Sequence, residues 1–175
     1  MTRAVMRDKV SAIFQCVIVM GVSGCGKTTV GKMLAERLDW DFIESDAFHS
    51  AEDVRKMSNG IPLTDDDRWP WLERLNAAIK EQQIEGRSCV VACSALKESY
   101  RELLCKGVTS CLYVYLKGDY PLIEKRMRQR AHFMKAGMLQ SQFDALEEPT
   151  DAITIDIRRS PDMIVEAITR QLTQP

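Results

Sequence analysis

A chain of 175 residues is long enough for one domain with a sizeable core and too short for two ordinary ones, so residues 1–175 are expected to form a single domain. Hydrophobic residues make up 45% and charged residues 28%, and 24 lysines and arginines are balanced by 25 aspartates and glutamates. This composition excludes a disordered chain and a basic nucleic-acid-binding domain. Because the net charge is −1, any anionic ligand has to be bound by a local group of basic residues.

The six cysteines lack the close spacing of a secreted disulfide-rich domain or of a zinc site, and the chain has only two histidines. We therefore expect free thiols. The longest uncharged stretch, residues 11–26, is too short to cross a bilayer and ends in a glycine-rich turn. Together these features predict a cytoplasmic protein without a membrane or nucleic-acid partner.

Five apolar, β-rich runs alternate with segments of helical periodicity, which predicts an α/β fold with a parallel sheet covered by helices on both faces. Strands are expected at residues 13–20, 41–45, 88–93, 112–116 and 153–157. Helices are expected to start near residues 27, 51, 67, 97, 121, 138 and 161. Residues 1–12 have no assigned role and are expected to fray.

The loops that follow parallel strands lie at one edge of a sheet, where ligands bind. The first of these loops has the sequence Gly-Val-Ser-Gly-Cys-Gly-Lys-Thr, a full match to the P-loop pattern G-x-x-x-x-G-K-[ST]. In this motif the backbone N–H groups and the following helix are expected to surround phosphate oxygens, Lys27 to reach the β- and γ-phosphates of a nucleoside triphosphate, and Thr28 to offer a hydroxyl to Mg²⁺. The predicted nucleotide-binding residues are Gly21, Val22, Ser23, Gly24, Cys25, Gly26, Lys27 and Thr28.

Other motifs narrow the class of P-loop protein. The D-x-x-G and N-K-x-D motifs of a GTPase switch are absent, and the third strand ends in Ser94 where many ATPases carry a metal-binding aspartate. Residues 126–135 carry five basic residues and no acid, as a lid that closes over phosphates would. We interpret these features as those of a small-molecule kinase with a lid at residues 126–138. Arg126 and Arg130 are expected to bind nucleotide, with a solvated helix face as the alternative.

The second strand leads to the candidate acceptor site. Asp46 is placed to accept the proton of an attacking hydroxyl or to orient it, with a helix cap as the alternative. His49 is either a ligand or a capping or packing residue. The aspartates at 65–67 complement a helix dipole, whereas Arg68 opposes it unless it pairs with a substrate carboxylate or with one of these aspartates.

From Met20 to about Pro149, the motifs of this chain resemble those of the gluconokinase family of P-loop kinases. Besides the P-loop, the resemblance rests on Asp46 and His49, Lys56-Met57, Gly60-Ile61-Pro62-Leu63, residues 65–68, Pro70-Trp71-Leu72, residues 93–97, Tyr100-Arg101, His132-Phe133-Met134 and Ser141-Gln142-Phe143. It implies an adenylate-kinase-like P-loop fold with a five-stranded parallel sheet and a mobile lid. It also implies a homodimer that transfers the γ-phosphoryl group of ATP to the 6-hydroxyl of D-gluconate.

The resemblance further implies which residues act. Lys27 and Asp46 are the catalytic residues, and the acceptor is bound by Asp46, His49, Lys56, Arg68, Ser94, Lys97 and His132. Arg68 is assigned to the carboxylate of gluconate and Asp46 to the reactive hydroxyl. The chain departs from the family pattern at Ser45, Ser50 and Asp53, where glycine, proline and asparagine are usual. Two alternatives stay open, namely a kinase for shikimate or a nucleotide, and an ATP-binding regulator without activity.

Overall fold

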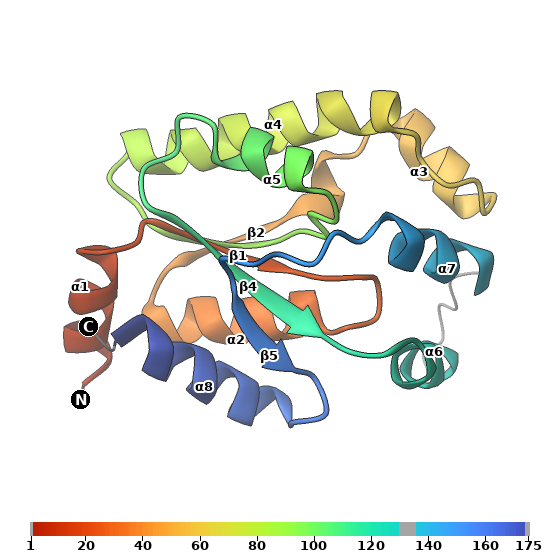
Figure 1. The fold of residues 1–175 in the computed structure, drawn as a ribbon. Coiled ribbons are helices and arrows are strands. Elements are labelled where there is room, and N and C mark those ends of the chain that lie inside the picture. The colour runs from red at the N-terminus through yellow and green to blue at the C-terminus, as the bar shows by residue number, and fades with distance from the viewer. Residues whose placement is uncertain (1, 130–135, 174–175) are drawn as a thin grey trace.

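The structure, a computed structural model, describes residues 2–129 and 136–173. One parallel sheet in the order β2-β3-β1-β4-β5 forms its centre (Figure 1). The strands are β1 (Cys16–Met20), β2 (Asp41–Glu44), β3 (Cys89–Ala92), β4 (Cys111–Lys117) and β5 (Ile153–Asp156). All residues of β1 and β3 are buried, as expected for apolar strands covered on both faces. The predicted α/β fold with one five-stranded parallel sheet is confirmed.

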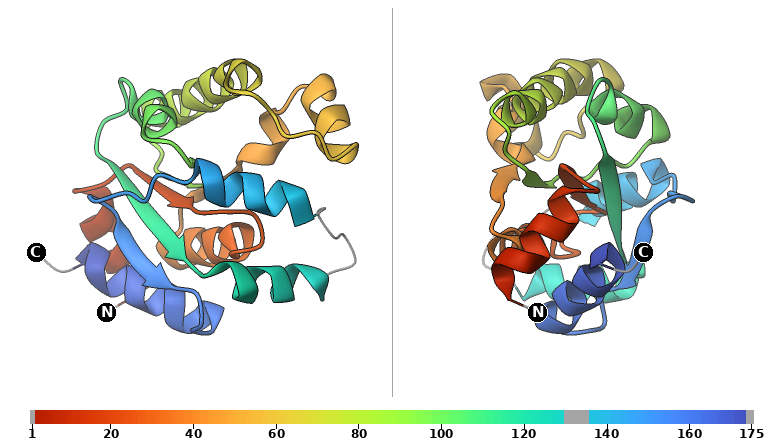
Figure 2. Two further views of the ribbon diagram at one scale, coloured as in Figure 1. Left: turned by 45° about the vertical axis from the view of Figure 1, so that its right-hand side comes forward. Right: turned by 90° about the vertical axis from the view of Figure 1, so that its left-hand side faces the viewer.

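Helices cover both faces of the sheet. Helices α2 (Lys27–Leu38) and α8 (Pro161–Thr173) lie on one face, and α4 (Asp65–Ile84) and α5 (Glu98–Cys105) lie on the other (Figures 1 and 2). The remaining helices are α1 (Arg3–Ser11), η1 (Ser45–Phe48), α3 (Ala51–Ser58), α6 (Tyr120–Arg128) and α7 (Ala136–Ala145). Figure 1 shows α3, α6 and α7 beyond the carboxyl ends of the strands. None of the helices in the described part of the chain has the length and apolar character needed to span a bilayer.

The side chains of β1 alternate between two hydrophobic clusters, one on each face of the sheet. Val17 and Val19 belong to the cluster under α2 and α8, whereas Cys16, Ile18 and Met20 belong to the cluster under α4 and α5. Burial of apolar surface on both faces contributes most of the stabilisation of such a sheet. It also fixes the carboxyl end of β1, from which the P-loop leaves.

The N-terminal residues form helix α1, so the expectation that they fray is wrong. Val10 is fully buried in the core, the Nε1 of Trp40 donates to Ser11 Oγ at 3.0 Å, and Arg7 pairs with Asp39 at 3.0 Å. These contacts come from residues far along the chain, and a short polar helix gives little sequence signal for them.

Helix α4 starts at Asp65, two residues before the predicted position. The reason is a capping box, in which the Thr64 hydroxyl accepts from the Asp67 N–H at 3.3 Å and the Asp67 carboxylate accepts from the Thr64 N–H at 3.0 Å. The aspartates therefore occupy the first turn rather than precede it, which places Arg68 at the start of the second turn.

Helix α1 allows a matched test of its docking. Val10→Ala is expected to lower the free energy of unfolding by about 2 kcal/mol, because it removes buried methyl groups and leaves a cavity. Val5 lies on the same helix with 56% of its surface exposed, and Val5→Ala is expected to change stability by less than about 0.5 kcal/mol. Urea denaturation measures both, and equal effects would contradict the docking of α1.

Candidate active site

The P-loop, residues 21–28, is shaped by glycines whose backbone conformation other residues rarely adopt. Gly21 has a φ of +138° and Gly24 a φ of +84°. A Cβ on Gly21 would lie 2.9 Å from the Leu116 carbonyl oxygen, and a Cβ on Gly24 would lie 2.6 Å from Cγ of Met127. Both the backbone conformation and the close packing require glycine. The loop therefore keeps its curve, with the N-terminal end of α2 directed into it.

Lys27 is the first residue of α2, and its Nζ donates to the Val22 carbonyl at 3.2 Å, across the loop. Thr28 follows in the first turn and is exposed. Cys25 is 1% exposed, and burial raises the pKa of its thiol although Lys27 opposes the shift. The loop thus presents a cation, a hydroxyl and a helix N-terminus to one place, which is the requirement for binding phosphates.

Helix α4 positions the segment after β2 that carries Asp46. The indole Nε1 of Trp71 donates to the Ser45 carbonyl at 2.8 Å, and Nε of Arg74 donates to the Phe48 carbonyl at 2.9 Å. The cap of α3 is provided by Ser50, so the alternative that Asp46 caps this helix is wrong. Its carboxylate instead lines the cavity described below.

His49 lies beside Asp46 and packs against α4. Its ring is stacked on Trp71 with centroids 4.4 Å apart and an angle of 12° between the planes. The side chain is 7% exposed, and Nδ1 lies 3.8 Å from the Asp53 carboxylate without a hydrogen-bond partner in the described part of the chain. Burial lowers the pKa of His49, although Asp46 and Asp53 oppose the shift. The imidazole is therefore neutral at neutral pH.

The aspartates of α4 engage the two lysines that were predicted to bind the acceptor. Lys97 Nζ lies 2.7 Å and 2.9 Å from the oxygens of Asp65, and Lys56 Nζ lies 2.7 Å from Asp67. Hydrogen bonds from Lys97 and Tyr100 lower the pKa of Asp65, and the one from Lys56 lowers that of Asp67 to about 2. Both lysines are thus directed at α4 rather than at the cavity.

Arg68 lies between these ion pairs and the cavity. Its guanidinium donates to the Tyr100 hydroxyl at 3.3 Å and lies 3.8 Å from Asp65, whose carboxylate accepts from the same hydroxyl at 2.5 Å. Because Asp65 already accepts from Lys97 and Tyr100, the charge of Arg68 is only partly matched inside the protein. The guanidinium lines the cavity and can bind an anion there.

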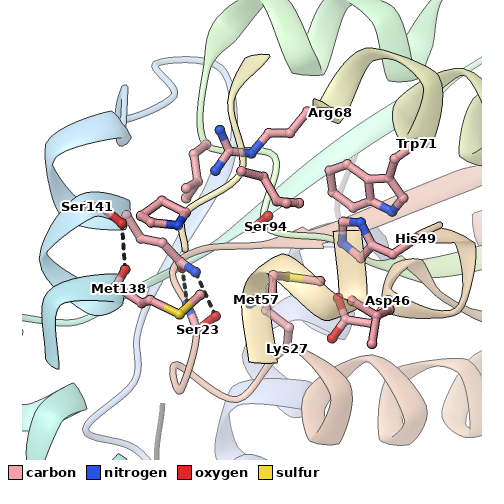
Figure 3. Close-up of a pocket in the computed structure, with 15 residues that line it drawn as sticks. Ser23, Lys27, Asp46, His49, Met57, Arg68, Trp71, Ser94, Met138 and Ser141 are labelled. Carbon is pink, nitrogen blue, oxygen red and sulfur yellow. Dashed lines mark hydrogen bonds between the residues drawn. The ribbon is translucent and has the colours of Figure 1, made fainter. Parts of the chain in front are cut away.

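A cavity of about 230 Å³ joins these elements at the carboxyl edge of the sheet. Figure 3 shows Arg68 at one side of it and Lys27 with Asp46 at the other. Its walls come from the P-loop, the segment after β2, α3, α4, the loop after β3 and α7. The lining residues are Ser23, Lys27, Asp46, His49, Val54, Met57, Pro62, Leu63, Arg68, Trp71, Ser94, Leu96, Met138, Ser141 and Gln142.

Gln142 of α7 is a site residue to which the motifs assign no role. Its Oε1 accepts from the Ser23 N–H at 2.7 Å, and its Nε2 donates to Ser23 Oγ at 2.9 Å (Figure 3). These two bonds tie α7 to the P-loop across 119 positions of sequence. The motif Ser141-Gln142-Phe143 was visible, but only the fold shows which loop it contacts.

A second hollow lies beside the start of α2. Gly26, Thr29, Arg126 and Arg159 are among the residues that line it. Arg126 donates to the Ile157 carbonyl at 2.6 Å, which fixes its guanidinium near the carboxyl end of β5. The other two predicted lid residues, Arg130 and His132, lie outside the described residues.

Comparisons with known proteins agree with this geometry. A family model described as an AAA domain matches residues 16–149. The thermosensitive gluconokinase of Escherichia coli K12 is 45% identical over 154 residues, which cover 85% of this chain and 82% of the relative. A solved gluconokinase from Sinorhizobium meliloti 1021 is 42% identical with a TM-score of 0.82, covering 91% of this chain and 92% of the other. The chain belongs to the gluconokinase family.

The resemblance inferred from the motifs is thereby confirmed. A solved sugar kinase from Janibacter sp. HTCC2649 is similar at 44% identity and a TM-score of 0.83, over 91% of this chain and 93% of the other. The APS kinase of Mycobacterium tuberculosis is only 16% identical, with a TM-score of 0.69 over 92% of this chain and 98% of its own, and it shows the shared fold alone. Within this gluconokinase-family fold, Asp46, His49, Arg68 and Ser94 converge on the cavity.

The burial of His49 makes a prediction for its titration. The chain has two histidines, so His132→Gln leaves one imidazole signal to follow by NMR. We expect the pKa of His49 to lie below 6.5. It should rise toward 6.5 in Trp71→Leu, and it should stay low in Trp71→Phe, because phenylalanine keeps an aromatic ring against the imidazole. Because the unfolded chain takes up this proton more readily, His49 lowers stability as the pH falls through about 6.5. A value above 6.5 would contradict the buried, neutral ring.

The link between Gln142 and Ser23 makes a second prediction. Gln142→Leu removes two hydrogen bonds from the P-loop and is expected to weaken binding of an unreactive ATP analogue about threefold to tenfold. Gln140 lies on the same helix but binds Asp144, so Gln140→Leu is the matched control and should bind as the parent does. Isothermal titration calorimetry measures both, and equal affinities in all three proteins would show that the P-loop does not depend on α7.

Proposed function

We propose that this chain is a gluconokinase that uses ATP and Mg²⁺ to phosphorylate the 6-hydroxyl of D-gluconate, giving 6-phospho-D-gluconate and ADP. The observation that carries the proposal is one cavity bordered by the P-loop lysine, a carboxylate and a partly matched arginine. Membership of the gluconokinase family supports the choice of acceptor. A sugar acid has a carboxylate at one end and a primary hydroxyl at the other, as the two sides of this cavity require.

On the nucleotide side, the P-loop N–H groups and Lys27 are proposed to bind the β- and γ-phosphates. The hydroxyl of Thr28 and the carboxylate of Asp46 are oxygen donors of the kind that Mg²⁺ prefers, so these residues fit that ion. The ion, when bound, neutralises charge that develops on the phosphates. The hollow that contains Thr29, Arg126 and Arg159 continues from the P-loop and is proposed to take the nucleoside.

On the acceptor side, Arg68 is proposed to bind the carboxylate of gluconate, and the Asp46 carboxylate to accept a hydrogen bond from the 6-hydroxyl. Orientation is the main requirement of phosphoryl transfer, and Asp46 takes the hydroxyl proton as the bond to phosphorus forms. His49, which is neutral, and Ser94 offer hydrogen bonds to the hydroxyls between the two ends. Lys56 and Lys97 act as positioning residues, because their charges hold the aspartates of α4.

The proposal includes a lid at residues 126–138, in which Arg130 binds nucleotide and His132 binds acceptor, and a homodimer working in the cytoplasm. A sedimentation mass of twice the 19.9 kDa chain mass would support the dimer, and a mass of one chain at working concentrations would contradict it.

The function is tested by coupling 6-phosphogluconate formation to its NADP-dependent oxidation. Asp46→Asn is expected to lower kcat at least about 100-fold, since a proton acceptor is lost. Arg68→Met is expected to raise the KM for gluconate about 10-fold to 100-fold with a smaller effect on kcat. Asp66→Asn and Arg55→Met, at exposed positions that do not line the cavity, serve as matched controls and should keep parent activity.

A panel of acceptors separates the alternatives. Turnover with shikimate or a nucleoside monophosphate but not with gluconate would replace the proposed substrate. Tight binding of ATP without turnover on any acceptor would indicate a regulator instead of an enzyme. Full gluconate kinase activity in both Asp46→Asn and Arg68→Met would show that the cavity is not the acceptor site.

A further inference from the structure

Four cysteines lie together at the amino ends of the strands, on the face of the sheet under α4 and α5. The parallel register pairs Cys16 of β1 with Cys89 of β3 and with Cys111 of β4. Paired residues of parallel strands point to the same face, so these three thiols form a row across the sheet. Cys105, the last residue of α5, packs against the same cluster. The row lies at the opposite end of β1 from the P-loop.

The two ends of this row differ in exposure. Cys16 and Cys89 are completely buried, whereas Cys105 and Cys111 are half-buried and line a cavity of about 340 Å³. Cys105 Sγ donates to the Tyr113 hydroxyl at 3.2 Å, and Tyr113 follows Cys111 by two residues on the same face of β4, in the same hydrophobic cluster. Hydrogen bonds from Cys105 and Cys16 lower the pKa of the Cys111 thiol, although burial opposes the shift. The two thiols thus belong to one cluster and line one cavity that is open to small solutes.

We propose that Cys105 and Cys111 are a modification site, a thiol pair that hydrogen peroxide oxidises reversibly to a disulfide within the chain. All six cysteines are free in the structure, so the reduced form is the one described here. The proposal does not depend on the proposed function, because neither residue lines the cavity that holds Lys27 and Asp46.

The chemistry of the cavity selects an uncharged oxidant. Among the described residues, Arg101 is the one basic residue that lines this cavity. Five carboxylates line it as well, those of Glu98, Glu102, Glu147, Glu148 and Asp151. The Arg101 guanidinium already donates to the Ala95, Leu96 and Glu147 carbonyls. Such a surface repels anionic disulfides but not neutral hydrogen peroxide.

The reaction balances in two steps. The Cys111 thiolate attacks one oxygen of peroxide, the O–O bond breaks, and the departing hydroxide takes up the proton that Cys111 released, which leaves a sulfenic acid and water. The Cys105 sulfur then attacks the Cys111 sulfur, the S–S bond forms, and the S–O oxygen leaves with the Cys105 proton as a second water. Two thiols are oxidised by two electrons, and one peroxide is reduced to two waters.

The local backbone suits a reversible bond rather than a structural one. Cys105 ends α5, where a helix frays most readily, and a short connection that contains Gly107 and Ser110 in left-handed conformations leads to Cys111. A disulfide across so short a loop removes less entropy from the unfolded chain than a disulfide across a long loop. The bond therefore stabilises the fold less than a long-range disulfide would, and it is expected to be reduced by a dithiol.

The disulfide between Cys105 and Cys111 can be detected directly in a tryptic digest. Trypsin cleaves after Arg101, Lys106 and Lys117, so Cys105 and Cys111 fall on separate peptides, 102–106 and 107–117. The reduced protein is treated with hydrogen peroxide, quenched with catalase, alkylated and digested without reductant. Mass spectrometry should find these two peptides joined, with four of the six thiols still free, and dithiothreitol should restore all six.

Single substitutions assign the roles. Cys105→Ala and Cys105→Ser should abolish the joined peptides and leave a sulfenic acid on Cys111 that dimedone labels, whereas Cys111→Ala and Cys111→Ser should leave no label on Cys105. Cys25→Ser, in the P-loop, should form the joined peptides at the parent rate. Circular dichroism shows whether each variant is folded. Because each cysteine is replaced both by alanine and by serine, one variant of the pair remains for the test if the other does not fold.

Two results would overturn the proposal. One is oxidation of the folded parent at Cys25, Cys93 or another buried thiol before the 105–111 linkage appears. The other is retention of all six thiols under conditions that oxidise free cysteine.

Discussion

The hydrogen bond from the Trp71 indole to the Ser45 carbonyl, with the stacking of the same ring on His49, is the interaction on which the site depends. It fixes the segment after β2 to α4. Because Arg68 lies one turn before Trp71 on this helix, the guanidinium and the Asp46 carboxylate are set by a single rigid element. The separation between the two ends of the cavity is therefore a property of α4 and not of flexible loops.

The aspartates of α4 have an electrostatic role beyond the helix dipole. Three acids at a helix N-terminus would attract the nearest cation, and Asp65 lies within reach of Arg68. Lys97 and Tyr100 donate hydrogen bonds to Asp65, and Lys56 donates one to Asp67. Both carboxylates therefore have nearer partners than the arginine. As a result Arg68 keeps enough unmatched positive charge to bind an anion in the cavity, although its own helix start is acidic.

What the sequence could and could not predict follows from the range of the interactions. The P-loop is local, since strand, glycines, Lys27 and helix are contiguous, and the order of strands and helices follows from periodicity. The pairing of Lys97 with Asp65 spans 32 positions and that of Gln142 with Ser23 spans 119, and no pattern along the chain encodes either. The resemblance implied that Lys56 and Lys97 bind the acceptor, and only packing shows that they meet Asp67 and Asp65. The docking of α1 on Trp40 was missed for the same reason.

Helix α1 packs beside α8, with Lys9 Nζ donating to the Thr173 carbonyl at 2.5 Å, and this contact lies away from the carboxyl edge of the sheet (Figures 1 and 2). Because the residues of this contact do not line the cavity that contains Lys27 and Asp46, a substitution there can change the stability of the fold without altering the phosphate-binding edge.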